Sequence, residues 1–222
     1  MALKAYCINL DSRPDKWKAT ETAFSDSGLT LQRFSGIVKS EGWRGCGASH
    51  VALAHEAMRL RLPYVIIVED DCVPVADFGV RFPLLLKALE ADSGWDMFLG
   101  GPTNVQGPID VREPLIEIER GFALHFYVLK ACAYEKAIAW NADRHGPIDV
   151  YYSDQFRIVT SHPAIATQRP SKSDIHGREV DYTSGFHDAT DSIDKLLYSL
   201  QTRHGTLLLV SFSVLLIFAL SR

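Results

Sequence analysis

Residues 64–68, Tyr-Val-Ile-Ile-Val, form an unbroken run of large apolar and β-branched side chains that leads directly into three acidic residues. Such runs are typical of central strands in parallel sheets, which helices cover on both faces. A predicted β-α-β unit precedes the run, with strands at 5–10 and 31–34 and a helix between them. We therefore expect an α/β domain with a mainly parallel sheet, whose ligands bind at the carboxyl ends of the strands.

Start and stop signals place the other elements. Ser12 and Asp15 have the spacing of a capping box, with a proline in the first turn, and they predict the start of the first helix. The glycine-rich stretch 42–47 is predicted to be a flexible loop, and Ser49 to cap a helix that ends at Leu62. The remaining expected elements are a helix around 82–89, strands at 97–99 and 123–129, and a helix at 132–140.

Composition and charge exclude several classes of protein. The chain has 222 residues, of which 47% are apolar, and this suits one globular domain with a sizeable core. It has 23 basic and 27 acidic residues, for a net charge of −4, and no long basic block, so no nucleic-acid partner is expected. Its 4 cysteines are far apart and form no CxxC pair, which argues against a zinc ribbon or a disulfide scaffold.

The two ends of the chain differ in character. The N-terminal segment lacks the apolar stretch of a secretory signal and no Asn-x-Ser/Thr site occurs, so a cytoplasmic location is predicted. Residues 206–220 contain 12 apolar side chains in 15 positions. As a helix they would span roughly 22 Å, against about 30 Å for the hydrocarbon core of a bilayer. They are therefore a borderline tail anchor, and the alternative is a hydrophobic helix packed on the domain.

These features predict a catalytic domain over 1–186, a polar linker or helix over 187–204 and a hydrophobic segment over 205–222. Membrane contact would occur through the last segment.

The acidic residues Glu69, Asp70 and Asp71 pose an electrostatic problem. Adjacent carboxylates beside apolar walls raise each other's pKa unless a positive charge compensates them. A divalent cation would do so, and hard ions such as Mn²⁺ or Mg²⁺ accept carboxylate oxygens. Alternation along an extended strand would place Glu69 and Asp71 on one side and Asp70 on the other. The simpler alternative is a polar loop whose acids cap the following helix.

Four segments, in their order along the chain, resemble glycosyltransferase family 25, which includes lipopolysaccharide and collagen-type sugar transferases. They are YCINLDSRPDKW at 6–17, GCGASH at 45–50, VIIVEDD at 65–71 and QRPSKSDI at 168–175. The resemblance covers about residues 5 to 180. It implies a single GT-A-like nucleotide-sugar-binding domain, a metal at a DxD-like acidic motif, and inverting transfer to an acceptor hydroxyl.

On this resemblance, Asp71 is the expected metal ligand and Glu69 assists it, since the two alternate along the strand. His176, beside the last matched segment, is a candidate third ligand. Asp70 would instead hold hydroxyls of the ribose or of the sugar. The expected cofactor is Mn²⁺ or Mg²⁺.

The nucleotide-sugar donor is expected to contact residues that follow the strands. Asn9 and Leu10 would line the base pocket, and Arg13 would face the nucleotide. Lys172 would meet the diphosphate. Further donor contacts are expected from the residues that start a helix and flank a short strand: Ser49, His50, Asp96 and Gly100.

Inverting transfer also requires a base opposite the leaving group, close to the attacking hydroxyl. Asp149 is the first candidate, because the family places acidic residues around this Pro-Ile-Asp segment, and Asp154 competes with it. The sequence thus predicts a metal-dependent glycosyltransferase that moves a hexose from a nucleoside-diphosphate sugar, such as a UDP-sugar, to a glycan, glycolipid or glycoprotein. The alternative is a noncatalytic, membrane-tethered scaffold of the same fold, which would have little reason to retain three crowded acids.

Overall fold

A computed structural model describes residues 3–112, 114–169, 171–172 and 179–180. In chain order, its elements are β1 (Leu3–Asn9), α1 (Pro14–Ala23), β2 (Leu29–Ser35), α2 (Gly42–Arg59), β3 (Tyr64–Glu69), β4 (Cys72–Pro74), α3 (Phe78–Ala91), β5 (Met97–Leu99), β6 (Thr103–Arg112), β7 (Leu115–Phe122), β8 (Phe126–Lys130), the 3₁₀ turn η1 (Ala131–Ala133), α4 (Tyr134–Ile138), α5 (Ala142–His145), α6 (Ile148–Gln155), β9 (Ile158–Thr160), β10 (Ala166–Gln168), β11 (Ser171–Lys172) and β12 (Glu179–Val180).

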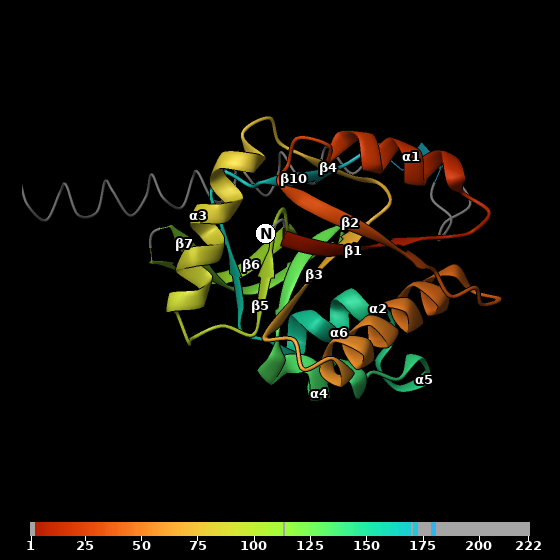
Figure 1. Cartoon of the computed structure of the whole chain (residues 1–222). Coiled ribbons are helices and arrows are strands. Elements are labelled where there is room, and N and C mark those ends of the chain that lie inside the picture. The colour runs from red at the N-terminus through yellow and green to blue at the C-terminus, as the bar shows by residue number, and fades with distance from the viewer. Residues whose placement is uncertain (1–2, 113, 170, 173–178, 181–222) are drawn as a thin grey trace, which may run out of the picture.

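One large sheet organises the described part of the chain (Figure 1). Its 8 strands lie in the order β2-β1-β3-β8-β5-β9-β7-β6. The pairs β1–β2, β1–β3 and β5–β9 are parallel, whereas β8 is antiparallel to both β3 and β5, and β7 to both β9 and β6. The sheet is therefore mixed: it is parallel around β1, as expected, and the reversed strands β8 and β7 interrupt it elsewhere.

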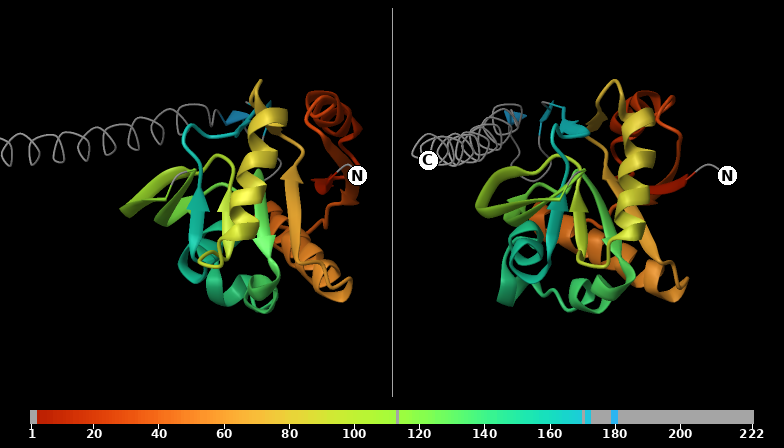
Figure 2. Two further views of the ribbon diagram at one scale, coloured as in Figure 1. Left: turned by 60° about the vertical axis from the view of Figure 1, so that its left-hand side comes forward. Right: turned by 90° about the vertical axis from the view of Figure 1, so that its left-hand side faces the viewer.

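The run at 64–68 forms the central strand β3, as the sequence predicts, and is buried on both faces. Val65 and Ile67 belong to the core that the sheet shares with α2, α4 and α6. Ile66 and Val68 belong to the opposite core, against α3. Figure 2 shows α3 crossing the sheet on the side away from α2 and α6. A strand with apolar side chains at every position is stable only in such a position.

The predicted strands at 5–10, 31–34 and 97–99 are confirmed as β1, β2 and β5, and the helix at 132–140 as η1 and α4. The hairpin of β6 and β7 was not predicted. Gly107 and Pro108 indicate a turn, but they lie within the edge strand β6, where a proline is tolerated and where the pairing with β7 is irregular between Gln106 and Ile109.

The predicted loop at 42–47 is wrong, because these residues form the first turns of α2. Their glycines permit close packing within a helix. A Cβ on Gly45 would lie 2.3 Å from the carbonyl oxygen of Ile37, and one on Gly47 would lie 2.3 Å from the ring of Trp140. Ser49 is therefore inside the helix and caps nothing: its hydroxyl donates to the Gly45 carbonyl.

The predicted capping box of the first helix is also wrong. The residue before α1 is Arg13, and no side chain caps the helix. Asp15 instead accepts two hydrogen bonds from the Arg13 guanidinium, at 3.1 and 3.0 Å.

No helix among the described residues is both long and apolar enough to cross a membrane. The boundary at 186, the linker at 187–204 and the segment at 205–222 lie outside the described residues. The tail anchor, and the location inferred with it, thus stay predictions.

The close approach at Gly45 generates a stability prediction. On helix propensity alone, Gly45→Ala should stabilise α2 by up to about 1 kcal/mol. The new methyl group would instead meet the backbone oxygen of Ile37. Overpacking of this kind costs roughly 1–3 kcal/mol, so we expect a net loss in the free energy of unfolding, measured with urea.

The matched control is Ala52→Gly in the same helix, which should cost only about 1 kcal/mol through propensity. A Gly45→Ala protein as stable as the wild type would show that the contact between α2 and the residue 37 backbone can relax.

Candidate active site

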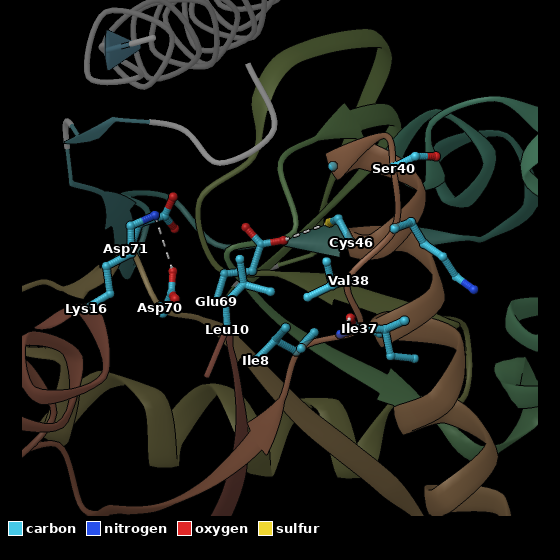
Figure 3. A pocket seen from close by; sticks show the side chains of 14 residues that line it. Ile8, Leu10, Lys16, Ile37, Val38, Ser40, Cys46, Glu69, Asp70 and Asp71 are labelled. Carbon is cyan, nitrogen blue, oxygen red and sulfur yellow. Dashed lines mark hydrogen bonds and ion pairs between the residues drawn. The ribbon is translucent and has the colours of Figure 1, made fainter. Parts of the chain in front are cut away.

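The carboxyl ends of β1, β2 and β3 meet at one edge of the sheet, where the structure holds a cavity of about 260 Å³ (Figure 3). Glu69 is the last residue of β3, and Asp70 and Asp71 form the turn into β4. All three acids line the cavity. Its other lining residues are Ile8, Leu10, Lys16, Gly36, Ile37, Val38, Lys39, Ser40, Gly42, Cys46 and Ser49.

Asp70 is held by groups from β1 and α1. Asn9 donates a hydrogen bond from Nδ2 to Asp70 Oδ2 at 2.7 Å, and the Lys16 ammonium lies 3.7 Å from Oδ1. The Thr20 hydroxyl donates to the Asp70 carbonyl at 2.6 Å. These contacts balance the charge of Asp70 and fix the turn after β3.

Asp71 is compensated less than Asp70. Its Oδ1 is buried and has no hydrogen-bond partner within the described residues. Burial, followed by repulsion from Glu69 and Asp70, raises the pKa of Asp71 to about 7, despite opposing contributions from Lys16 and Gln168. Asp71 therefore has one buried oxygen without a hydrogen-bond partner among the described residues, and its negative charge is only partly offset.

Glu69 faces α2 instead of its two acidic neighbours (Figure 3). His50 Nε2 lies 3.0 Å from Glu69 Oε1, and the Cys46 thiol lies 3.8 Å from the same oxygen. Burial, the largest single effect, opposes ionisation of Glu69, but the hydrogen bond and charge of His50, with smaller contributions from His125 and Cys46, together lower the pKa. On its other side, His50 Nδ1 lies 2.9 Å from the Tyr127 hydroxyl.

Asp149, in the first turn of α6, belongs to the same electrostatic neighbourhood. Burial raises its pKa, and the charge of Glu69 adds to this effect. The charge of Asp149 in turn contributes to the raised pKa of Cys46. Asp154, on the same helix, is half-exposed and pairs with Arg120 at 2.6 Å. Neither Asp149 nor Asp154 lines the cavity.

Asp96 is misplaced in the sequence interpretation. It precedes β5, whereas Gly100 follows it, so the two lie at opposite edges of the sheet. Arg157 donates to Asp96 from its guanidinium at 2.9 Å and from its backbone at 3.1 Å. Asp96 thus anchors the amino end of β9 and not a donor pocket.

Gly100 lies at the expected edge but has a packing role. A Cβ there would come within 2.6 Å of the Phe126 ring, so the glycine lets this ring pack against the backbone.

Two predicted donor contacts, Asn9 and Ser49, make hydrogen bonds within the protein. Asn9 is buried and outside the lining, where it bonds Asp70, the Arg13 carbonyl and the Arg33 guanidinium. Ser49 lines the cavity, but its hydroxyl already bonds the Gly45 carbonyl and the Ile37 amide.

The other predicted donor contacts lie in different places relative to the cavity. Leu10 lines the cavity. His50 is fully buried behind Glu69. Arg13 directs its guanidinium to Asp15 and lies outside the lining. Lys172 belongs to β11, with its side chain outside the described part, and His176 lies outside it altogether.

The sequence does not lead to a predicted site role for two of the lining residues, Lys16 and Cys46. Lys16 stands four positions before Thr20, on the face of the first helix that the apolar spacing turns inward, so its place was open to prediction. Cys46 was hidden because its segment was interpreted as a loop, whereas in α2 it stands one turn before His50.

The unbalanced charge of Asp71 predicts that Asp71→Asn stabilises the metal-free protein at pH 8, by roughly 1–3 kcal/mol. A carboxyl whose pKa is higher in the folded than in the unfolded protein binds a proton on folding. Its contribution is complete below the unfolded pKa near 3.8 and is lost as the pH rises through about 7. The advantage of the variant should therefore be small at pH 5 and larger at pH 8, in urea unfolding with EDTA.

The exposed Asp26, which does not line the cavity, supplies the control Asp26→Asn, whose effect should not change over this pH range. An advantage of Asp71→Asn that is the same at pH 5 and pH 8 would contradict the assignment.

Comparison with known proteins shows a similarity of fold to solved structures. No family model and no curated protein matches the sequence. Among solved structures, A197 from STIV matches with a TM-score of 0.51 at 12% identity, over 77% of this chain and 87% of that one. A glycosyltransferase involved in glycosylation of the major capsid of PBCV-1 matches with a TM-score of 0.42 at 11% identity, over 66% and 69%. Apo UDP-glucose pyrophosphorylase matches with a TM-score of 0.43 at 10% identity, over 87% and 81%. The chain therefore shares an α/β fold with A197, while its likeness to family 25 rests on the sequence motifs.

Proposed function

We propose that this protein is a metal-dependent glycosyltransferase that moves a hexose from a nucleoside-diphosphate sugar, such as a UDP-sugar, to an acceptor hydroxyl. The observation that carries the proposal is the convergence of three successive carboxylates on one cavity that also has an apolar wall. A scaffold would gain nothing from burying these charges beside one another, since each desolvated acid costs free energy. The motif resemblance to family 25 points to the same chemistry.

The donor set fits a hard divalent cation. Asp71 offers a buried oxygen without a partner in the described residues, and carboxylate oxygens are the ligands that Mn²⁺ and Mg²⁺ prefer. Asp71 would hold the ion, with Glu69 assisting from the end of β3. When bound, the ion would neutralise charge that develops on the departing diphosphate.

The cavity has distinct regions for the parts of a nucleotide sugar. Leu10, Ile37 and Val38 supply apolar surface on which a base can lie. Lys16 brings a positive charge to the acidic side, where it can meet the diphosphate. Asp70 also lines the cavity and is placed to accept hydrogen bonds from ribose or sugar hydroxyls.

Asp149 is our candidate for the base. Its raised pKa favours proton uptake, and its charge acts on Cys46 and Glu69 at the cavity wall. In an inverting displacement, Asp149 would accept the proton of the acceptor hydroxyl as the bond from that oxygen to the anomeric carbon forms and the bond to the diphosphate breaks. The acceptor class is a glycan, glycolipid or glycoprotein, and a membrane-borne acceptor would suit the apolar segment at 205–222.

A direct test measures the release of nucleoside diphosphate from a panel of nucleotide sugars, with Mn²⁺ and then with EDTA. We expect release from at least one donor that requires the metal, together with a donor-dependent rise in thermal stability. Donor binding without metal-dependent release, for every donor, would favour the noncatalytic scaffold.

The base assignment predicts that Asp149→Asn lowers the transfer rate by roughly 10²–10⁴-fold while donor binding persists, because only proton acceptance is lost. Rates are measured at saturating donor, and donor affinity by calorimetry.

The matched control is Asp154→Asn, a similar change one turn and a half along the same helix, which should transfer at nearly the wild-type rate. If this variant loses transfer and Asp149→Asn keeps it, the base is Asp154.

A further inference from the structure

Three side chains at the α2 side of the cavity bring different ligand atoms together. Cys46 Sγ, His50 Nε2 and a Glu69 carboxylate oxygen all lie within 4.8 Å of one another. The sulfur and the imidazole distinguish this group from the all-oxygen position at Asp71. Thiolate, imidazole and carboxylate together are a ligand set typical of zinc, whereas Mg²⁺ and Mn²⁺ prefer oxygen alone.

The spacing of the three atoms is close to that of zinc ligands. Zinc bonds of 2.0–2.3 Å at tetrahedral angles separate a nitrogen from an oxygen ligand by roughly 3.4 Å, and a sulfur from an oxygen ligand by roughly 3.6 Å. Here Nε2 lies 3.0 Å from Glu69 Oε1, and Sγ lies 3.8 Å from it. Sγ and Nε2 lie within 4.8 Å of each other, against roughly 3.5 Å around a tetrahedral zinc, so Cys46 and His50 would approach each other by up to about 1 Å to hold the ion.

The surroundings of His50 suit a ligand. Its Nδ1 lies 2.9 Å from the hydroxyl of Tyr127, a buried residue of β8. The hydrogen bond to Glu69 requires a proton on Nε2 in the metal-free protein. Zinc binding would use the other tautomer, in which Nδ1 donates to the Tyr127 hydroxyl and the Nε2 lone pair faces Cys46 and Glu69. Zinc-binding histidines are usually oriented in this way by a hydrogen bond from the other ring nitrogen.

We propose that Cys46, His50 and Glu69 form a zinc site in the wall of the cavity. Cys46 and Glu69 both line the cavity, so the ion has an entry path. Three protein ligands with one open position are typical of zinc sites that bind a further ligand. On binding, the thiol of Cys46 loses its proton to solvent and its sulfur becomes a ligand.

One consequence rests on the proposed function. A zinc ion at this position would hold Glu69 on the α2 side and place a positive charge at Cys46, on which the charge of Asp149 acts, so zinc should inhibit sugar transfer. The binding itself does not depend on the protein being a transferase, and the experiment below reads binding alone.

The test uses the full chain, purified without metal under reducing conditions, and Co²⁺ as a spectroscopic substitute for zinc. We expect an absorption band of thiolate-to-cobalt charge transfer and visible bands of tetrahedral Co²⁺, which one equivalent of Zn²⁺ abolishes. Cys46→Ser should lose the charge-transfer band and weaken binding by more than the roughly 10–100-fold that loss of an outer-shell partner costs. Tyr127→Phe should keep the band and weaken binding by about 10–100-fold.

Two variants serve as matched controls. Cys132→Ser removes another thiol that lies beside a carboxylate, 3.5 Å from Asp96, but which has no histidine in the group. Asp71→Asn removes the hard-metal ligand. Both should retain the cobalt spectrum, and thermal unfolding in the absence of metal verifies that every variant folds. A spectrum without the thiolate band, or one that persists in Cys46→Ser, would overturn the zinc site and leave the proposed transferase function untouched.

Discussion

The end of β3 places three negative charges in succession where the protein has little water to solvate them, and the surrounding structure is arranged around that constraint. Each of the three acids has different partners. Glu69 is held by the buried His50, and Asp70 by Asn9 and Lys16. Asp71 keeps a buried oxygen for which the described residues supply no partner. Since desolvated charge is costly, the uncompensated acid marks the position at which an external cation would contribute most.

The two sides of this acidic edge have different chemistry. Toward α1, the ligand atoms are oxygens accompanied by an ammonium group, which suits a hard cation and phosphate oxygens. Toward α2, sulfur and imidazole stand beside Glu69, which suits a softer ion. Glu69 faces the α2 side, and its charge raises the pKa of Asp71, so occupancy of one side would influence the other. A site of this kind can link a reaction to the supply of a second metal.

The central strand, its acidic end and the cavity at the carboxyl edge could be predicted from the sequence, because an apolar run of that length needs cover on both faces. The reversal of β8 could not, since strand direction depends on contacts between residues far apart in the chain. Asp96 was misplaced for a local reason: an acid next to a short apolar strand can lie at either of its ends. The glycines of 42–47 were misinterpreted because the pattern shows their flexibility but not the neighbours that exclude a side chain. The predictions for Lys172 and His176 stay untested, because the structure does not describe these side chains.

The segment between β2 and α2 is fastened at its first two residues, Gly36 and Ile37. The Gly36 amide bonds the Asn9 carbonyl at 2.9 Å, the Ile37 amide bonds the Ser49 hydroxyl at 2.8 Å, and the Ile37 carbonyl packs against Gly45. This wall of the cavity is consequently preorganised, and a ligand that lies on it would lose little free energy to ordering the chain. The fixed shape of this surface would determine which ligands fit. Water would have to be excluded from the opposite side of the cavity.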